Sequence, residues 1–313
     1  MADDSSAPRR GFPDIAQSFG NYTFSHILAE GGKGVIFEAE HTSIKRRVAL
    51  KIVSPKYAAR EGISTALIAA FMREARVMGA IDHPNVVTLY DAGVVGQCPY
   101  LAMQLISGGD LQRQILKHGP MRVEGALVLL RNCAAGLGAI HDAGYINRDI
   151  KPANVLMELN GTPRISDFGV AVPANEVPTD DVIAGTPSYL APEQIHHQGL
   201  DARSDIYSLG ASFWYVTTGK APFDGSSSEE ILSHLLTATK PPHLDLGSSS
   251  SAQGLTQIIL HAMDFQPDKR YQNTDEIIHD CSAVLAGGEP EYALIGKKNR
   301  RTFLGAMLDR ARL

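Results

Sequence analysis

The chain of 313 residues carries a formal net charge of −5, with 44% hydrophobic and 20% charged residues. This length allows one large domain or two lobes, and the ordinary composition excludes wholesale disorder. The slight acidity argues against a protein that binds nucleic acid mainly through phosphate contacts.

The first 20 residues are rich in Ser, Pro, Asp and Arg and contain no apolar run. We expect residues 1–20 to form a flexible tail rather than a secretory signal. Residues 21–103 contain short runs of β-branched and aromatic residues, which predict the strands of a small lobe. One segment, residues 64–80, has apolar residues spaced by three and four and predicts a helix. The expected strands are residues 22–28, 34–41, 46–53, 86–95 and 100–106.

The pattern changes after Gly108 and Gly109, and residues 104–285 predict a larger, mainly helical lobe. Residues 21–285 together therefore predict an α+β fold. The longest apolar stretch, residues 126–140, is interrupted by Arg131 and Asn132, so we do not expect it to span a membrane. The expected helices are residues 127–143, 204–218, 228–238, 255–264 and 274–285, with a loop at 247–251.

The residue types that bind metals or form disulfides are sparse and scattered. Cys98, Cys133 and Cys281 form no CxxC pair, so a zinc cluster or a redox dithiol is not expected. An odd, small number of cysteines fits a reducing compartment, and we expect a cytoplasmic protein. His196 and His197 lie beside no cluster of carboxylates, so a solvated loop is expected there rather than a metal site.

Residues 286–313 form a tail with a basic run followed by an amphipathic pattern. An isolated helix of this length is marginal in water, so its apolar stripe needs burial. The alternatives are packing on the same chain, docking on a partner protein or a second copy, and binding to an anionic membrane surface. The basic run is Lys297, Lys298, Arg300 and Arg301, and the stripe is Phe303, Leu304, Met307, Leu308 and Ala311.

Two signals in the first lobe suit a phosphate ligand, although each has a plain alternative. Gly31 and Gly34 lie between two predicted strands, where glycine lets a backbone approach phosphate oxygens; an ordinary turn would look the same. Lys51 ends an apolar strand, and a buried ammonium needs an anionic partner. Phosphates and Glu74 are the expected partners, and a surface lysine with a buried stem is the alternative.

Three blocks in the second lobe decide in favour of phosphate chemistry: residues 148–154 (RDIKPAN), 167–169 (DFG) and 191–193 (APE). Phosphoryl transfer needs an acceptor for the substrate proton, oxygen ligands for magnesium and cations for the moving phosphoryl group. Asp149 supplies the acceptor, and Asn154 with Asp167 supplies the metal ligands. Lys151 and Lys51 supply the cations.

With these blocks in this order, residues 22–285 resemble a Hanks-type (eukaryotic-like) Ser/Thr protein kinase of the bacterial kind. The resemblance implies a bilobal fold, in which a five-stranded antiparallel sheet with one helix (helix C) precedes a helical lobe. It implies ATP with Mg²⁺, or Mn²⁺, as cofactors and transfer of the γ-phosphoryl group to serine or threonine in protein substrates. The choice of Ser/Thr over Tyr rests on Lys151, two residues after Asp149, and on residues 185–187 (GTP).

The resemblance also implies a role for each matching residue. The catalytic residues would be Asp149, Lys151, Lys51 and Glu74, and the metal ligands Asn154 and Asp167. The nucleotide would contact Ala29, Gly31, Gly34, Ile36, Lys51, the gatekeeper Met103, the hinge residues Gln104 and Leu105 through their backbone, and Asp110 at the ribose. Structural roles would fall to Thr186 in the substrate-receiving loop, Asp205 beneath the catalytic loop, and a buried pair of Glu193 with Arg270, for which two surface charges are the alternative.

Three positions depart from the family pattern. Ala29 replaces the first glycine of the phosphate loop, Asn147 replaces a histidine before Arg148, and Gln104 replaces a hinge glutamate. The first two support the alternative of a nucleotide-binding pseudokinase or scaffold, which metal-dependent ATP turnover would exclude. A small-molecule kinase is a second alternative, but such enzymes usually lack the long segment between residues 167 and 193.

Arg148, next to the catalytic Asp149, marks kinases in which a phosphate on the activation loop pairs with that arginine. Thr179 is the only hydroxyl residue between Asp167 and Gly185, so we expect it to be the phosphosite. Alternatively, residues 180–181 (DD) already supply the negative charge.

Overall fold

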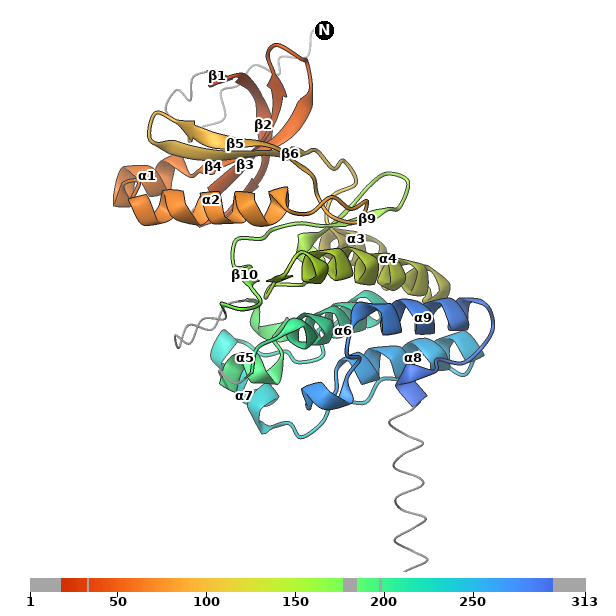
Figure 1. Ribbon diagram of the computed structural model, residues 1–313. Coiled ribbons are helices and arrows are strands. Elements are labelled where there is room, and N and C mark those ends of the chain that lie inside the picture. Colours follow the sequence, from red (N-terminus) through yellow and green to blue (C-terminus); the bar gives the residue numbers. More distant parts are fainter. Residues whose placement is uncertain (1–17, 33, 177–184, 197–198, 295–313) are drawn as a thin grey trace, which may run out of the picture. The chain divides into compact units, whose positions relative to one another are not determined.

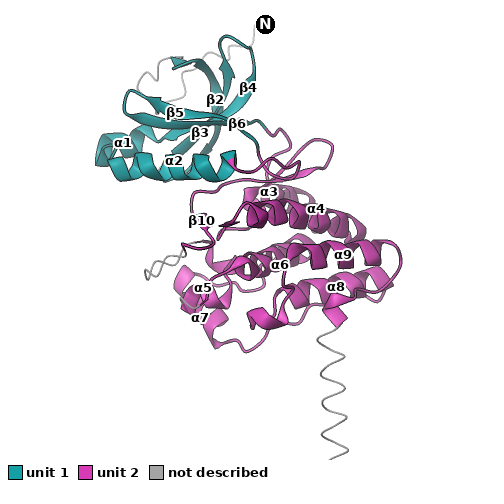
Figure 2. Ribbon diagram, viewed as in Figure 1, with its two compact units in different colours: residues 1–79, 88–105 teal, residues 80–87, 106–313 magenta. Residues whose placement is uncertain are grey.

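The computed structural model describes residues 18–32, 34–176, 185–196 and 199–294, and it divides into two compact units (Figure 2). Unit 1 comprises residues 1–79 and 88–105, and unit 2 comprises residues 80–87 and 106–313. The predicted division after residue 103 thus falls two residues early. It also misses that residues 80–87 belong to the helical unit.

Unit 1 is a curled antiparallel sheet of six strands in the order β1-β2-β3-β4-β6-β5 (Figure 1). Tyr22, Phe37 and Leu50 belong to the apolar cluster that fills one face of the sheet. The strands are β1 (Ser18–Phe19), β2 (Tyr22–Glu30), β3 (Gly34–His41), β4 (Arg47–Val53), β5 (Leu89–Val95) and β6 (Cys98–Gln104).

The sixth strand, β1, lies where the sequence predicts a flexible tail. The Phe19 ring packs on Phe24 and Tyr100, with centroids 6.3 and 5.8 Å away, so the chain joins the sheet at Ser18. The prediction of five strands was therefore one strand short. Strand β1 has only two residues, too few to show the alternation of apolar and polar residues that marks a strand.

Strand β4 directs Lys51 away from the apolar cluster. Residues alternate between the two faces of a strand, so Leu50 and Ile52 are buried in the cluster whereas Lys51 lies on the other face. Helix α2 (Thr65–Gly79), the predicted helix C, contacts β5 and β6 and brings Glu74 to Lys51. Helix α1 (Pro55–Glu61) was not predicted, because it buries none of its residues and so has no apolar stripe.

Residues 80–87 belong to unit 2 through backbone pairing. The Ile165 N–H donates to the Asn85 carbonyl at 2.8 Å, and Val87 N–H donates back to the Ile165 carbonyl at 2.9 Å. The Asn85 side chain donates to the Pro163 carbonyl at 3.0 Å. Gly136 permits this approach, since a Cβ there would lie 2.6 Å from the Asn85 oxygen.

Unit 2 is built around helices α4 (Val123–Asp142) and α6 (Ala202–Thr218), which contact each other and α8 (Ser250–Ala262). Helix α4 is the one described helix that is long and apolar enough to span a membrane, but half of that stretch is buried in this unit. It packs on α9 (Thr274–Leu285) as a core helix (Figure 1). The other elements are α3 (Leu111–His118), α5 (Pro192–His196), α7 (Ser228–Thr237), the short strands β7 (Tyr145–Ile146), β8 (Val155–Met157), β9 (Pro163–Ile165) and β10 (Val172–Pro173), and the 3₁₀ turns η1 (Pro152–Asn154), η2 (Pro187–Tyr189) and η3 (Pro267–Lys269).

The helix starts differ most from the sequence prediction. Helix α8 begins at Ser250, inside the predicted loop, because the Ser249 hydroxyl accepts from the Ala252 N–H and caps the helix. Helix α4 begins at Val123, four residues before the predicted start. Helix α3 was not predicted; Asp110 caps it by accepting from the Arg113 N–H.

The folded part of unit 2 continues past the predicted end at residue 285. The fully buried Asp280 carboxylate accepts from the backbone N–H groups of Glu291, Tyr292 and Ala293 at 2.7, 3.1 and 2.9 Å. It also accepts from the Tyr271 hydroxyl at 2.8 Å. Burial, and then the nearby carboxylate, raise the pKa of Tyr271 well above its ordinary value, so this hydroxyl stays a donor. Residues 286–294 are therefore anchored to unit 2, and only 295–313 of the predicted tail lie outside the described residues.

Candidate active site

The loop that carries Asp149 is held from beneath by Asp205, as predicted. The Asp205 carboxylate is fully buried and accepts from the backbone N–H groups of Asn147 and Arg148, both at 2.8 Å. His141 at the end of α4 lies 2.9 Å from the same carboxylate. Arg148 has a φ of +69°, in the left-handed region that non-glycine residues rarely adopt. Asp205 thus helps to fix a strained backbone directly before Asp149, the predicted base.

The Asp149 carboxylate lies among three hydrogen-bond donors. Lys151 Nζ and Asn154 Nδ2 donate to Oδ2 at 2.7 and 3.0 Å. The Thr186 hydroxyl donates to Oδ1 at 3.1 Å and accepts from Lys151 Nζ at 2.7 Å. The Thr186 hydroxyl therefore already lies, relative to Asp149, where a substrate hydroxyl would have to lie for proton transfer.

Asn147, the departure from the family histidine, connects the catalytic loop to the DFG loop. Its Oδ1 accepts from the Asp149 N–H at 3.1 Å, and its Nδ2 donates to the Asp167 carbonyl at 3.4 Å. A histidine at position 147 could also make the first of these bonds. His41 and His83 each show this geometry, because their Nδ1 accepts from the backbone N–H two residues later. Asn147 therefore supplies both an acceptor and a donor at this position.

Asn154 and Asp167, the predicted metal ligands, come together through the backbone. The Asn154 carbonyl accepts from both the N–H and the hydroxyl of Ser166, at 2.8 and 2.9 Å. Because Asn154 Nδ2 donates to Asp149, the amide oxygen is directed away from that carboxylate. Asp167 has a φ of +63°, and its Oδ1 accepts from the Gly169 N–H. Two oxygen donors without a histidine or thiolate suit Mg²⁺, which completes its shell with phosphates and water.

Unit 1 holds the second set of predicted catalytic residues. Lys51 Nζ donates to both oxygens of Glu74, at 2.8 and 2.9 Å. The side chains are 18% and 5% exposed, so this pair is shielded from water, unlike most surface ion pairs. The prediction that Lys51 pairs with Glu74, rather than lying at the surface, is confirmed.

The glycine-containing turn follows directly from β2. The Gly31 N–H donates to the Gly34 carbonyl at 2.9 Å and closes the turn before β3. Ala29 pairs with Ile36 across the two strands and does not have a positive φ. The alanine therefore fits this position without backbone strain.

The predicted hinge and ribose residues are partly engaged in local bonds. Met103 pairs with Ala49 in the sheet, and the Gln104 N–H donates to the Thr88 carbonyl at 2.9 Å. The Gln104 N–H thus has a partner within unit 1, and the contact of adenine with the backbone of Gln104 and Leu105 stays a prediction. Leu105, half-buried, is the last residue of unit 1. Asp110 caps α3 in unit 2, and its ribose contact stays a prediction.

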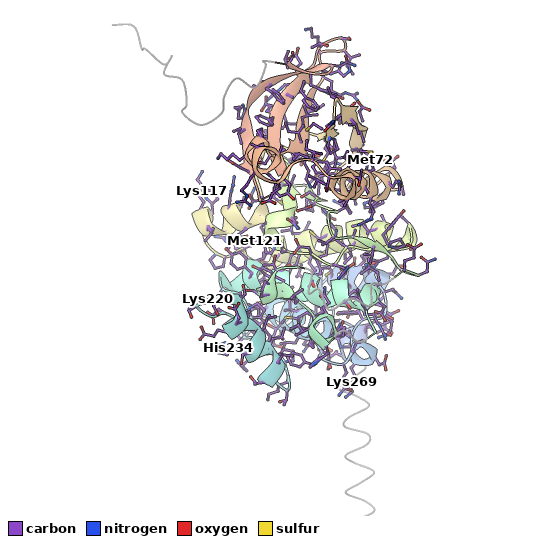
Figure 3. The ribbon with its side chains drawn as sticks, turned by 90° about the vertical axis from the view of Figure 1, so that its left-hand side faces the viewer. Met72, Lys117, Met121, Lys220, His234 and Lys269 are labelled. Atoms are coloured by element: carbon purple, nitrogen blue, oxygen red, sulfur yellow. The ribbon has the colours of Figure 1, made fainter. Side chains whose placement is uncertain are left out.

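Glu193 and Arg270 form the predicted buried pair. Arg270 donates through two nitrogens to the two Glu193 oxygens at 2.6 and 2.7 Å, and its side chain is fully buried. The Ser204 hydroxyl donates to Glu193 Oε1 at 2.7 Å. Lys269, one residue earlier, lies at the surface (Figure 3).

Sequence reasoning missed three contributors: His141, Ser204 and Gln194. Their partners lie 64, 11 and 46 residues away in the sequence, so no local pattern shows these contacts. Gln194 directly follows the APE block, but this position does not by itself indicate a bond to Arg148. Thr179, Lys33 and residues 295–313 lie outside the described residues. Among the described residues, no group of three His, Cys, Asp or Glu side chains is placed to hold a metal ion.

Comparison with known proteins identifies the family. Residues 22–281 match the protein kinase domain. The chain belongs to the protein kinase family. The kinase is 32% identical over 295 residues to the serine/threonine-protein kinase PknL of Mycobacterium tuberculosis, covering 93% of this chain and 73% of PknL. It is 35% identical to pkn2 of Myxococcus xanthus (87% and 33% covered) and 31% identical to PknB of M. tuberculosis (90% and 46% covered).

These relatives place the kinase among the bacterial Hanks-type Ser/Thr protein kinases. Membership implies ATP and a divalent metal as cofactors and proteins as substrates. It supports the enzyme over the pseudokinase alternative, in agreement with the retained Lys51, Asp149 and Asp167.

Substitution of Asn147 tests whether its two bonds align the site. We predict that Asn147→Ala lowers kcat roughly ten-fold, because loss of a buried hydrogen-bonding group costs about 1–3 kcal/mol. Asn147→His should retain most of the activity, since its Nδ1 can restore the bond to the Asp149 N–H. Steady-state kinetics with ATP and a generic basic protein would measure this, with thermal unfolding as a check on folding. An unchanged kcat in Asn147→Ala would show that the link is dispensable.

Proposed function

We propose that this kinase transfers the γ-phosphoryl group of Mg²⁺–ATP to serine or threonine hydroxyls of proteins in bacterial signalling, including its own. The observation that carries the proposal is the Asp149 carboxylate, which accepts from the Thr186 hydroxyl at 3.1 Å while Lys151 bridges the two side chains. A substrate hydroxyl in the place of Thr186 would be oriented for attack and would lose its proton to Asp149.

The other predicted catalytic residues and metal ligands supply or neutralise charge. Lys151 in unit 2 supplies a cation beside Asp149, and Lys51 in unit 1, oriented by Glu74, supplies the other. Asn154 and Asp167 would hold the metal, which neutralises phosphate charge when bound. We propose Mg²⁺ as this metal and expect Mn²⁺ to replace it.

Removing the base or the lysine should abolish transfer. We predict that Asp149→Asn and Lys51→Met each lower phosphotransfer by roughly 10²-fold or more, because charge and positioning supply most of the rate enhancement. Asp149→Asn should still bind Mg²⁺–ATP, because the base is not a nucleotide ligand. Transfer of ³²P from labelled ATP to a generic protein would measure the rates.

Asp268→Asn is a matched control for the loss of charge, since the Asp268 side chain is 91% exposed and its bond to Arg203 lies at the surface. This control should keep wild-type turnover. Near wild-type turnover in Asp149→Asn or Lys51→Met would remove the kinase proposal.

We also propose autophosphorylation at Thr179. The support is the sequence alone: Arg148 precedes the catalytic Asp149, and Thr179 is the only hydroxyl residue between Asp167 and Gly185. We predict one phosphate at Thr179 after incubation with ATP, seen by intact-mass and fragment spectra, and several-fold lower activity in Thr179→Ala. Full activity in Thr179→Ala would instead indicate that Asp180 and Asp181 supply the charge.

For the C-terminal tail we propose a docking role on a partner protein, which includes a second copy of the chain. The support is the basic run and apolar stripe of residues 297–311, together with the anchoring of the chain up to Leu294. A cytoplasmic location fits the three free cysteines in the described residues.

Two truncations separate docking from folding. We predict that a chain ending at Leu294 keeps its stability and its activity on a generic protein but loses part of its phosphoproteome in cells. A chain ending at Gly288 should be about 1–3 kcal/mol less stable, because it leaves the buried Asp280 without three donors. Unfolding of the chain that ends at Leu294 would contradict the docking role and make the tail part of the fold.

A further inference from the structure

The peptide group between Arg148 and Asp149 is bonded on both sides by side-chain amides. Its N–H, which belongs to Asp149, donates to Asn147 Oδ1 at 3.1 Å. Its carbonyl, which belongs to Arg148, accepts from Gln194 Nε2 at 3.4 Å. Rotation of this peptide plane would turn the Cα–Cβ bond of Asp149, so these two amides bear directly on the direction of the carboxylate.

Gln194 is suited to this contact by both ends of its amide. It is 8% exposed on α5, and its Oε1 accepts from the Ala191 N–H at 2.9 Å, which fixes the side chain. The other end of the amide, Nε2, is then directed to the Arg148 carbonyl. The two contacts need a side chain that supplies an acceptor and a donor together, which methionine and an ionised glutamate do not.

The Arg148 carbonyl is also where the substrate-receiving segment meets the catalytic loop. Gly185, just before Thr186, has a φ of +118°, and a Cβ there would lie 2.8 Å from this carbonyl oxygen. The segment therefore passes the carbonyl closely at Gly185 and returns to it at Gln194. Both contacts lie within unit 2.

We propose that Gln194 is a positioning residue that orients Asp149 by holding the Arg148 carbonyl, and so couples the end of the substrate-receiving segment to the base. This inference rests on the proposed function, because it assigns Gln194 a part in the same transfer reaction. It predicts an effect on the chemical step rather than on nucleotide affinity.

Two substitutions separate the two bonds of Gln194. Gln194→Glu keeps the acceptor for Ala191 but loses the donor to Arg148, whereas Gln194→Met has a similar length and loses both. We expect both variants to lower kcat about ten-fold, the size of one lost buried hydrogen bond, with the KM for ATP unchanged. Rates are normalised to the concentration of nucleotide-binding sites, so that unfolded protein does not count.

Asn85→Ala is the matched control, because Asn85 is also 8% exposed and also donates from an amide to a distant carbonyl, that of Pro163. It should lower the melting temperature but leave normalised kcat near wild type. If Asn85→Ala lowers kcat as much as Gln194→Met does, the effect is general loosening of unit 2 and the inference is overturned.

A double-mutant cycle with Asn147→Ala tests the shared peptide. If both amides hold one peptide group, the loss in kcat for the pair is smaller than the product of the single losses. The inference would be overturned if the two losses in kcat simply multiplied, or if kcat were unchanged in Gln194→Glu. The proposed function would still stand in that case, provided that the wild type is active and Asp149→Asn is inactive. An inactive wild type would overturn the proposed function instead.

Discussion

The catalytic loop depends on one buried carboxylate. Asp205 accepts from two consecutive backbone N–H groups and lies within hydrogen-bonding distance of His141. These bonds help to hold the positive φ of Arg148, because strain of this kind persists only where the surroundings determine it. The direction of Asp149, and through it of Lys151, Asn154 and Thr186, follows from this backbone.

Two of the sites of buried charge in unit 2 serve the same purpose, which is to fix a loop near Asp149. Asp205 supports the catalytic loop, and the Glu193–Arg270 pair fixes the end of the substrate-receiving segment against α6 through Ser204. A buried pair adds little net stability over apolar packing, but breaking it leaves an uncompensated charge. The two arrangements therefore specify where these loops lie, beside the apolar side chains such as Ile150 and Leu190 that the loops also bury.

The sequence predicted most of the fold, because long strands and helices carry clear periods. It failed for β1 and α1, which are too short or too exposed to show a pattern, and for α3, in which only Leu111 and Ile115 are buried. The catalytic roles came from the family resemblance, and the structure adds their contacts within each unit. Gln194 and His141 could not be predicted, since their partners lie 46 and 64 residues away.

The amide at position 147 has a consequence for acid tolerance. An imidazole must hold one nitrogen as acceptor and the other as donor to make both bonds, and it loses the acceptor when it is protonated near pH 6.5. The Asn147 amide has no such titration. The connection between the catalytic loop and the DFG loop therefore stays the same from mildly acidic to neutral conditions.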